Sequence, residues 1–137
     1  MYNAIMIPVD LAHVDQLTKA LKTGADLAKL YSARLVAVGV TGSAPSEVAH
    51  NPAEYAQKLA AFAADQSARL GVAVEAKAVT SHDPAVDIDD TLEKAADEIG
   101  ADLVIMASHI PGMMEYVIAS RAGYLASHSS RSVFVVR

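Results

Sequence analysis

The most informative absence in this 137-residue sequence is that of cysteine. Without cysteine the chain cannot form a disulfide, a thiolate nucleophile or a zinc–thiolate site, so thiol-based redox chemistry is excluded. The absence also fits a reducing cytosol. Basic residues are scarce as well, because 11 Lys and Arg stand against 16 Asp and Glu and give a formal net charge of -5. They form no cluster, and the chain has no tryptophan, so nucleic acid is not expected as a partner.

The sequence also shows no targeting segment and no membrane-spanning segment. Its first ten residues carry no basic region, and no apolar run approaches the length needed to cross a bilayer. We therefore expect a mature cytoplasmic protein with no membrane partner. Because no repeat, linker or low-complexity tract divides the chain, residues 1–137 are expected to form one domain that buries its own core.

Short apolar runs alternate with helical patterns along the whole chain. Strands are expected over 4–9, 35–40, 72–80, 103–107 and 133–136, the third as a half-exposed edge strand because Glu75 and Lys77 share one side. Helices are expected over 15–31, 51–70, 84–99 and 116–127, with Asp83 as the N-cap of the third and Gly71 and Gly100 ending the second and third. The alternation predicts a single-domain α/β fold, a three-layer sandwich with a parallel sheet between helices.

Three segments, taken together and in order, resemble the universal stress protein family over essentially the whole chain. They are Ile-Met-Ile-Pro-Val-Asp at 5–10, Ala-Asp-Leu-Val-Ile-Met-Ala-Ser-His at 101–109 and Ser-Val-Phe-Val-Val-Arg at 132–137. The resemblance implies a five-stranded parallel sheet of order 3-2-1-4-5. It also implies a homodimer in which the fifth strands meet. That strand order places a topological switch between the first and fourth strands, where ligands of open α/β sheets bind.

Nucleotide-binding members of this family carry a glycine-rich loop after the fourth strand. It reads Gly, two residues, Gly, nine residues, then Gly followed by Ser or Thr, and its glycines let the backbone approach the phosphates. Here Ala107, Ile110 and Ala119 occupy the three glycine positions, and the loop is one residue shorter. The Ser-His-Ile-Pro sequence at 108–111 resembles a bacterial subgroup with this shorter loop, in which arginine stands where this chain has isoleucine.

The resemblance implies a site for ATP or a related adenine nucleotide, with or without Mg²⁺. Asp10 would contact the adenine or the ribose, the backbone of Val40 would contact the base, and Ser120, expected near a helix start, would contact a phosphate. The full set of expected site residues is Pro8, Val9, Asp10, Val40, Ala107, Ser108, His109, Ile110, Ala119, Ser120 and Arg121.

Several of these residues have an equally simple structural role. Asp10 could cap the turn after the first strand, Ser120 could be an ordinary helical serine, and His109 could bond to loop backbone. Met113-Met114 could cover the pocket, form a partner surface or pack in the core. Acidic residues near the start of the third helix are expected to stabilise its N-terminus rather than to bind a cation: Asp87, Asp89 and Asp90.

Other functions of this architecture are excluded by the residues at strand ends. A response-regulator receiver needs an aspartate at the end of the third strand, where this chain has Thr80. A flavodoxin needs a hydroxyl-rich loop after the first strand, and an ATP pyrophosphatase needs a Ser-Gly-Gly loop there. This chain has the acidic and apolar sequence Asp-Leu-Ala-His-Val-Asp at 10–15 instead. Two functions of different class remain, a nucleotide-responsive binding module and a nucleotide-free stress protein that acts only through protein–protein interaction. Slow ATP hydrolysis or autophosphorylation at Ser120 is a third, enzymatic alternative.

The terminal strand is expected to join two copies of the chain. Residues 132–136 are apolar and lie at the sheet edge in the inferred order, and an unpaired edge of this kind favours a two-fold dimer. Phe134 and Val136 share one face and Val133 and Val135 the other, so both faces are expected to be buried. Any further protein partner is unspecified by the sequence.

Overall fold

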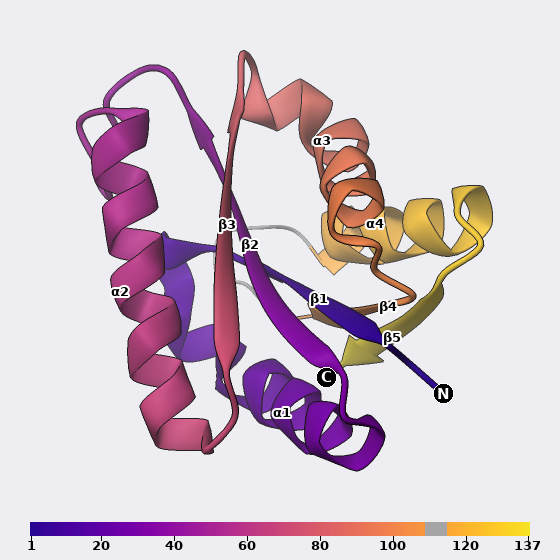
Figure 1. The fold of residues 1–137 in the computed structure, drawn as a ribbon. Coiled ribbons are helices and arrows are strands. Elements are labelled where there is room, and N and C mark those ends of the chain that lie inside the picture. The colour runs from indigo at the N-terminus through magenta and orange to yellow at the C-terminus, as the bar shows by residue number, and fades with distance from the viewer. Residues whose placement is uncertain (109–114) are drawn as a thin grey trace.

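The computed structural model describes residues 1–108 and 115–137 as alternating strands and helices (Figure 1). In chain order its elements are β1 (Ala4–Val9), the 3₁₀ helix η1 (Leu11–Leu17), α1 (Thr18–Tyr31), β2 (Arg34–Gly42), α2 (Pro52–Leu70), β3 (Val74–Ser81), α3 (Pro84–Ile99), β4 (Leu103–Ala107), α4 (Glu115–His128) and β5 (Ser132–Val136). No helix in the described residues is long and apolar enough to span a bilayer.

The five strands form one parallel sheet in the order β3-β2-β1-β4-β5, which confirms the predicted topology. β1 pairs with β2 along its whole length, from Ala4 with Arg34 to Val9 with Gly39. Against β4, however, only Ile5 and Met6 of β1 are in register, with Leu103 and Val104. The two central strands therefore stop pairing before their carboxyl ends, and the sheet opens at that edge.

Alternate side chains of the central strands enter two separate cores, so the molecule has three layers (Figure 1). Ile5 and Ile7 of β1 pack with residues of α1 and α2 on one face. Met6 between them packs with Leu92 of α3 and Leu125 of α4 on the other face. This period of two, buried on both sides, is why the strand reads as a continuous apolar run.

Helix ends follow the predicted capping chemistry except at the start of α3. Asn51 begins α2, where its Oδ1 accepts from the Glu54 N–H at 2.8 Å, and Pro52 occupies the first helical position. α2 ends at Gly71 and α3 at Gly100, and both glycines adopt a left-handed φ of 67°. Asp83 is at the N-cap of α3, but its side chain makes no capping bond; its carbonyl accepts from the Val86 and Asp87 N–H groups instead.

Three expected boundaries are wrong by two residues or more. β3 begins at Val74 and not at residue 72. The segment expected to be α-helical from residue 15 is a 3₁₀ helix as far as Leu17, because Asp10 caps a turn that starts directly after β1. β2 continues past residue 40 to Gly42, because β3 keeps pairing with it as far as Ser81.

The two edges of the sheet differ in character. β3 is an edge strand as predicted, and its charged side chains are paired: Glu75 with Arg34 at 2.9 Å and Lys77 with Glu98 at 2.7 Å. At the β5 edge, the expected burial of both faces is wrong within the single chain, since Phe134 is 46% and Val135 39% exposed. The two cores reach the neighbouring residues of β5 on either side but leave these two open.

Candidate functional site

The open carboxyl edge of the sheet brings together most of the predicted site residues. Pro8 and Val9 end β1 beside Val38 and Gly39 of β2, and Asp10 follows them. Val40 continues β2 at this edge. On the other side of the opening, Ala107 ends β4 and Ser108 follows it, with its N–H donating to the Val136 carbonyl at 2.9 Å.

The Asp10 carboxylate has two partners within its own turn. Its Oδ1 accepts from the Ala12 N–H at 2.9 Å, and its Oδ2 lies 3.0 Å from Nδ1 of His13. The capping role of Asp10 is therefore present in the structure. A carboxylate offers about four acceptor positions, and 39% of this side chain is exposed, so it retains acceptor capacity toward a ligand. The contact with His13 could have been noticed from its spacing of three residues.

Tyr55 of α2 lies beneath this edge, which sequence reasoning missed. It is 95% buried, since only 5% of the residue is exposed, and its hydroxyl lies against the backbone of Gly39, where an added Cβ would collide with it. Burial, and secondarily the negative charge of Asp10, raises the pKa of Tyr55 to about 12. The phenol is therefore neutral at physiological pH. In the sequence it is only one member of an apolar helical stripe, and its position depends on how α2 packs on β2.

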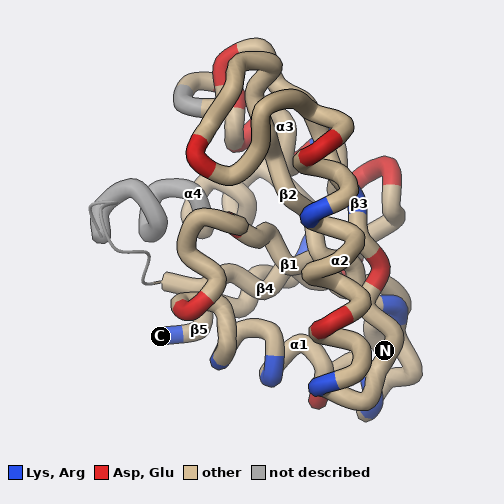
Figure 2. Tube along the Cα trace, turned by 90° about the vertical axis from the view of Figure 1, so that its left-hand side faces the viewer, with Lys and Arg blue, Asp and Glu red and all other residues tan. Residues whose placement is uncertain are grey.

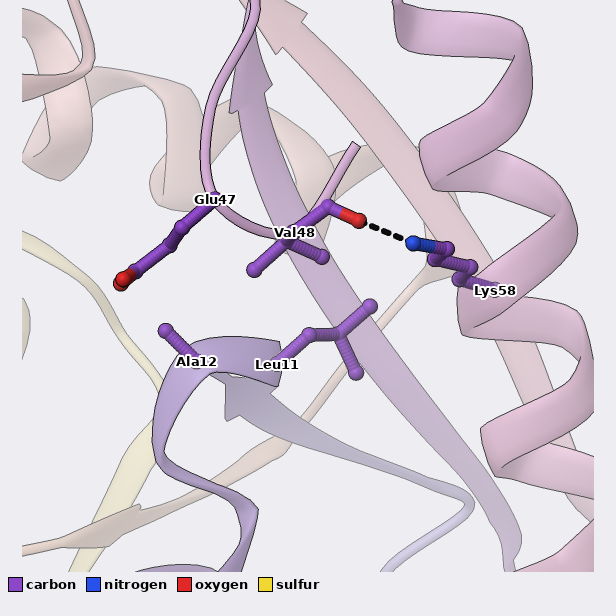
Figure 3. A pocket seen from close by; sticks show the side chains of 5 residues that line it. All are labelled: Leu11, Ala12, Glu47, Val48 and Lys58. Carbon is purple, nitrogen blue, oxygen red and sulfur yellow. Dashed lines mark hydrogen bonds between the residues drawn. The ribbon is translucent and has the colours of Figure 1, made fainter. Parts of the chain in front are cut away.

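A cavity of about 440 Å³ lies next to Asp10, between the start of η1 and the loop that joins β2 to α2 (Figure 3). Leu11 and Ala12 form one wall and Val48 the opposite wall. Glu47 and Lys58 lie at opposite ends of it (Figure 3). The cavity thus combines apolar walls with one acceptor and one donor side chain. We call it the η1–loop cavity.

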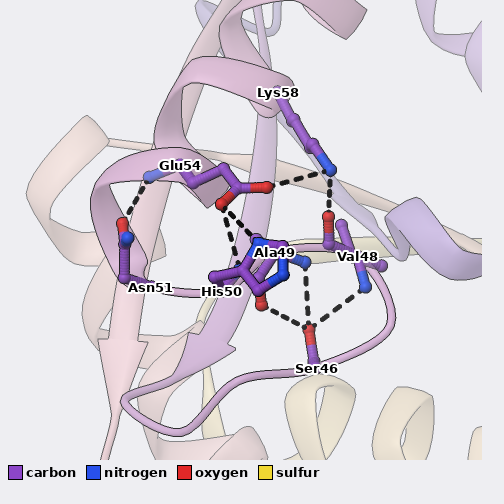
Figure 4. A network of polar contacts seen from close by, with 7 residues as sticks. All are labelled: Ser46, Val48, Ala49, His50, Asn51, Glu54 and Lys58. Atoms are coloured by element: carbon purple, nitrogen blue, oxygen red, sulfur yellow. Dashed lines mark hydrogen bonds and ion pairs between the residues drawn. The ribbon is translucent and has the colours of Figure 1, made fainter.

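The loop wall of the η1–loop cavity is held by a polar network (Figure 4). Lys58 donates from Nζ to the Val48 carbonyl, and the same Nζ lies 3.3 Å from Oε1 of Glu54. Glu54 in turn accepts from the His50 backbone N–H at 3.2 Å and lies 3.0 Å from the His50 ring nitrogen. The contact with the His50 side chain is the main reason that the pKa of Glu54 is lowered. Ser46 adds a third tie, because its Oγ accepts from two loop N–H groups at 3.3 Å.

A second cavity, of about 350 Å³, lies at the other end of η1, beside Ala107 and Ser108. Its basic side chains are Lys19, Lys22 and Arg137. Lys22 pairs with Asp26 at 2.9 Å, and the ammonium of Lys19 donates to the Arg137 carbonyl. The carboxylate of Asp15 also lines this cavity, so its charges are basic on balance. Across the described residues, no group of three or more His, Asp or Glu side chains is placed to hold a metal ion.

The remaining predicted site residues follow β4. His109 and Ile110 lie outside the described residues, as do Met113 and Met114. Ala119, Ser120 and Arg121 belong to α4, which begins at Glu115, so they lie past its first turn rather than at its opening.

Comparison with known proteins identifies close matches in fold. Residues 1–137 match the model of the universal stress protein family. A universal stress protein family member from Burkholderia pseudomallei is 26% identical, with a TM-score of 0.68 over 98% of this chain and 96% of that chain. A universal stress protein in complex with cAMP is 20% identical, with a TM-score of 0.72 over 99% and 97%. The universal stress protein of Archaeoglobus fulgidus in complex with dAMP is 18% identical, with a TM-score of 0.64 over 99% and 98%.

Proposed function

This chain belongs to the universal stress protein family, and from that premise we propose that it binds an adenine nucleotide at the carboxyl edge of its sheet. The observation that carries the proposal is the opening between β1 and β4, with Asp10 on one side and Ser108 on the other. Ligands of open α/β sheets bind at such a switch point. Structural neighbours in complex with cAMP and dAMP support an adenine nucleotide as the ligand.

The two cavities suggest how the nucleotide is oriented. The η1–loop cavity takes the base, because Leu11 and Val48 supply apolar walls and the carboxylate of Glu47 would repel a phosphate. The backbone of Val40 lies at the same edge and contacts the base. Phosphates point the other way, toward Ser108 and the basic side chains of α1. The ribose then lies over Asp10, which accepts hydrogen bonds from its hydroxyl groups.

The alanines at two of the family's glycine positions are compatible with the backbone of this chain. Ser32 is the only non-glycine residue with positive φ in the part of the chain that the structure describes, so Ala107 has a backbone that alanine tolerates. Ala119 is helical, where alanine is favourable. We propose ATP or a related adenine nucleotide, with or without Mg²⁺, as the ligand, and Ser120 and Arg121 as phosphate-binding residues.

The proposed biological unit is a cytoplasmic homodimer that acts in the stress response and signals by changing a partner surface. Each copy would contribute β5, which pairs only with β4 in the described sheet and leaves Phe134 and Val135 exposed. Pairing of two such edges would satisfy the free backbone groups and cover both side chains.

A nucleotide-free protein that acts only through its dimer surface is the second candidate. The observation that favours it is that both oxygens of the Asp10 carboxylate already have partners in the turn, so the fold explains this residue without a ligand. The two candidates differ in one measurable property, which is saturable binding of nucleotide.

Isothermal titration with ATP, ADP and AMP, each with and without Mg²⁺, tests the proposal. The wild-type chain should bind at least one of them saturably, and Asp10→Asn, which keeps the Oδ1 acceptor for Ala12, should weaken binding about tenfold. Asp65→Asn is the matched control, because that carboxylate is exposed on α2 and pairs with Arg69, and neither residue lines the proposed site. Absence of saturable binding at millimolar nucleotide would favour the nucleotide-free candidate.

A further inference from the structure

A third cavity, of about 350 Å³, lies on the opposite side of the sheet from the η1–loop cavity. It is formed by the last residues of the edge strand β3, the residue that follows them and the side of α3 next to that strand, and we call it the β3–α3 cavity. Val79 and Ala95 supply its apolar surface, and the rest of its lining is polar. Neither the fold nor the proposed nucleotide site uses it.

Ser81 is the residue of this cavity that most needs a partner. It is the last residue of β3 and is 93% buried, since only 7% of it is exposed, and its Oγ makes no hydrogen bond. Strand alternation puts Ser81 on the same side as Val79 and Lys77, and Lys77 pairs with Glu98 of α3. The hydroxyl therefore faces the α3 side, where it lines the cavity. A buried hydroxyl without a partner is unfavourable, so this atom requires a ligand or a water molecule.

Charges of both signs line the same cavity. Six of the 16 acidic residues lie on α3, several of which can be followed as red segments in Figure 2. Asp87 and Asp90 line the cavity. Lys94 also lines it, one turn from Asp90 and one turn from Glu98. Within the described residues, Lys94 forms no ion pair, Asp87 has no polar side-chain partner, and Asp90 accepts only from the Tyr124 hydroxyl at 3.3 Å. One ammonium and two carboxylates therefore remain for a ligand.

This arrangement selects against ligands of a single charge. Asp87 and Asp90 would repel an anion, and a simple cation would pair with them but leave Lys94 without a partner. A zwitterion meets both conditions, because its ammonium can pair with the carboxylates while its carboxylate pairs with Lys94. The Ser81 hydroxyl can then donate to the ligand carboxylate, and Val79 and Ala95 can contact a small apolar side chain.

We propose that the β3–α3 cavity binds a free α-amino acid. Its ammonium lies against Asp87 and Asp90, its carboxylate against Lys94 and Ser81, and its side chain over Val79. The site is separate from the carboxyl edge between β1 and β4, so it does not depend on nucleotide binding.

Amide chemical-shift titration of the full chain with each of the twenty standard amino acids, at millimolar concentration, tests the proposal. At least one should give saturable shifts confined to residues 79–98. The corresponding amine without the carboxylate, and the corresponding acid without the ammonium, should each bind about tenfold more weakly.

Three variants sharpen the test. Ser81→Ala and Lys94→Met should each weaken the amino acid about fivefold to tenfold, whereas Lys22→Met, on the far side of the molecule in α1, should leave its affinity unchanged. Ser81→Ala removes an unpaired buried hydroxyl, so it is expected to stay folded. The proposal is overturned if no amino acid gives saturable shifts, which would mean that water alone fills the cavity, or if the amine or the acid binds as well as the zwitterion.

Discussion

The carboxylate of Asp10 has two partners in its own turn and is still accessible to solvent. It therefore serves the fold, by capping η1, and the proposed site, by offering its remaining lone pairs. Tyr55, in contrast to Asp10, is buried and contacts a residue distant in sequence. Its hydroxyl reaches the edge of the site because Gly39, against which it packs, has no Cβ. At this scale the site is made by contacts between residues that are distant in sequence.

Asp10→Ala and Asp10→Asn should separate the two roles of the carboxylate. The alanine variant loses the bond from the Ala12 N–H, so its free energy of unfolding should fall by about 1 kcal/mol. The asparagine variant keeps an acceptor and should stay within a few tenths of that of the wild type. Urea unfolding measures both, and equal losses in the two variants would contradict the capping role.

Gly39→Ala should destabilise the protein by about 2 kcal/mol, because its Cβ would meet the Tyr55 hydroxyl. Adding Tyr55→Phe removes that atom and should recover part of the loss, although the ring carbons remain close. A double-mutant cycle measured by urea unfolding reports this coupling. Additive losses would show that the two residues do not meet.

Elements bounded by buried apolar runs could be predicted closely from the sequence. β1 and β4 have the expected bounds, because each is apolar on both faces and a polar residue follows directly. Boundaries failed where tertiary contacts decide them, as at the end of β2, which follows its pairing with β3. The same holds for the site: the strand ends predict Asp10 and Ser108, whereas the position of Tyr55 depends on how α2 packs against the sheet.

Asp102 ties the start of β1 to the start of β4. Its carboxylate accepts from the Asn3 and Ala4 N–H groups at 2.9 to 3.1 Å. Partial burial works against the charged form, but these backbone bonds outweigh it and lower the pKa of Asp102 below its ordinary value. Two neighbouring central strands are therefore joined by one ionised side chain at the edge opposite the site.

This tie should make stability depend on pH. Because the folded pKa of Asp102 is depressed, its contribution is present above the unfolded value of 3.8 and is lost as pH falls through the folded value. Asp102→Asn should cost about 1 kcal/mol at neutral pH. The difference from wild type should shrink below about pH 4. Urea unfolding at several pH values measures this, and a difference that stays constant with pH would contradict it.

For the whole molecule, the two sheet edges have opposite surfaces. Paired charges line β3, and such charges prevent edge-to-edge association. Apolar side chains are exposed on β5. The charges are also divided, with acidic residues along α3 and basic residues along α1 (Figure 2). A second copy is therefore expected at β5 and not at β3.

Phe134→Glu should convert the proposed dimer to a monomer at micromolar concentration, because it places a charge in the centre of the β5 surface. Leu30→Glu is the matched control, since Leu30 is exposed on α1, away from either edge. Light scattering coupled to size exclusion gives the mass of each. A wild-type mass of one chain, or an unchanged dimer in Phe134→Glu, would contradict the β5 interface.

Amide chemical-shift mapping of the wild-type chain with ATP and Mg²⁺ tests the central claim most directly. The account predicts saturable shifts that cluster at residues 9–12, 39–41 and 46–49 on the base side, and at 15–22, 107–108 and 119–121 on the phosphate side. Absence of saturation, or shifts centred on any other part of the described chain, would contradict a nucleotide site at this edge.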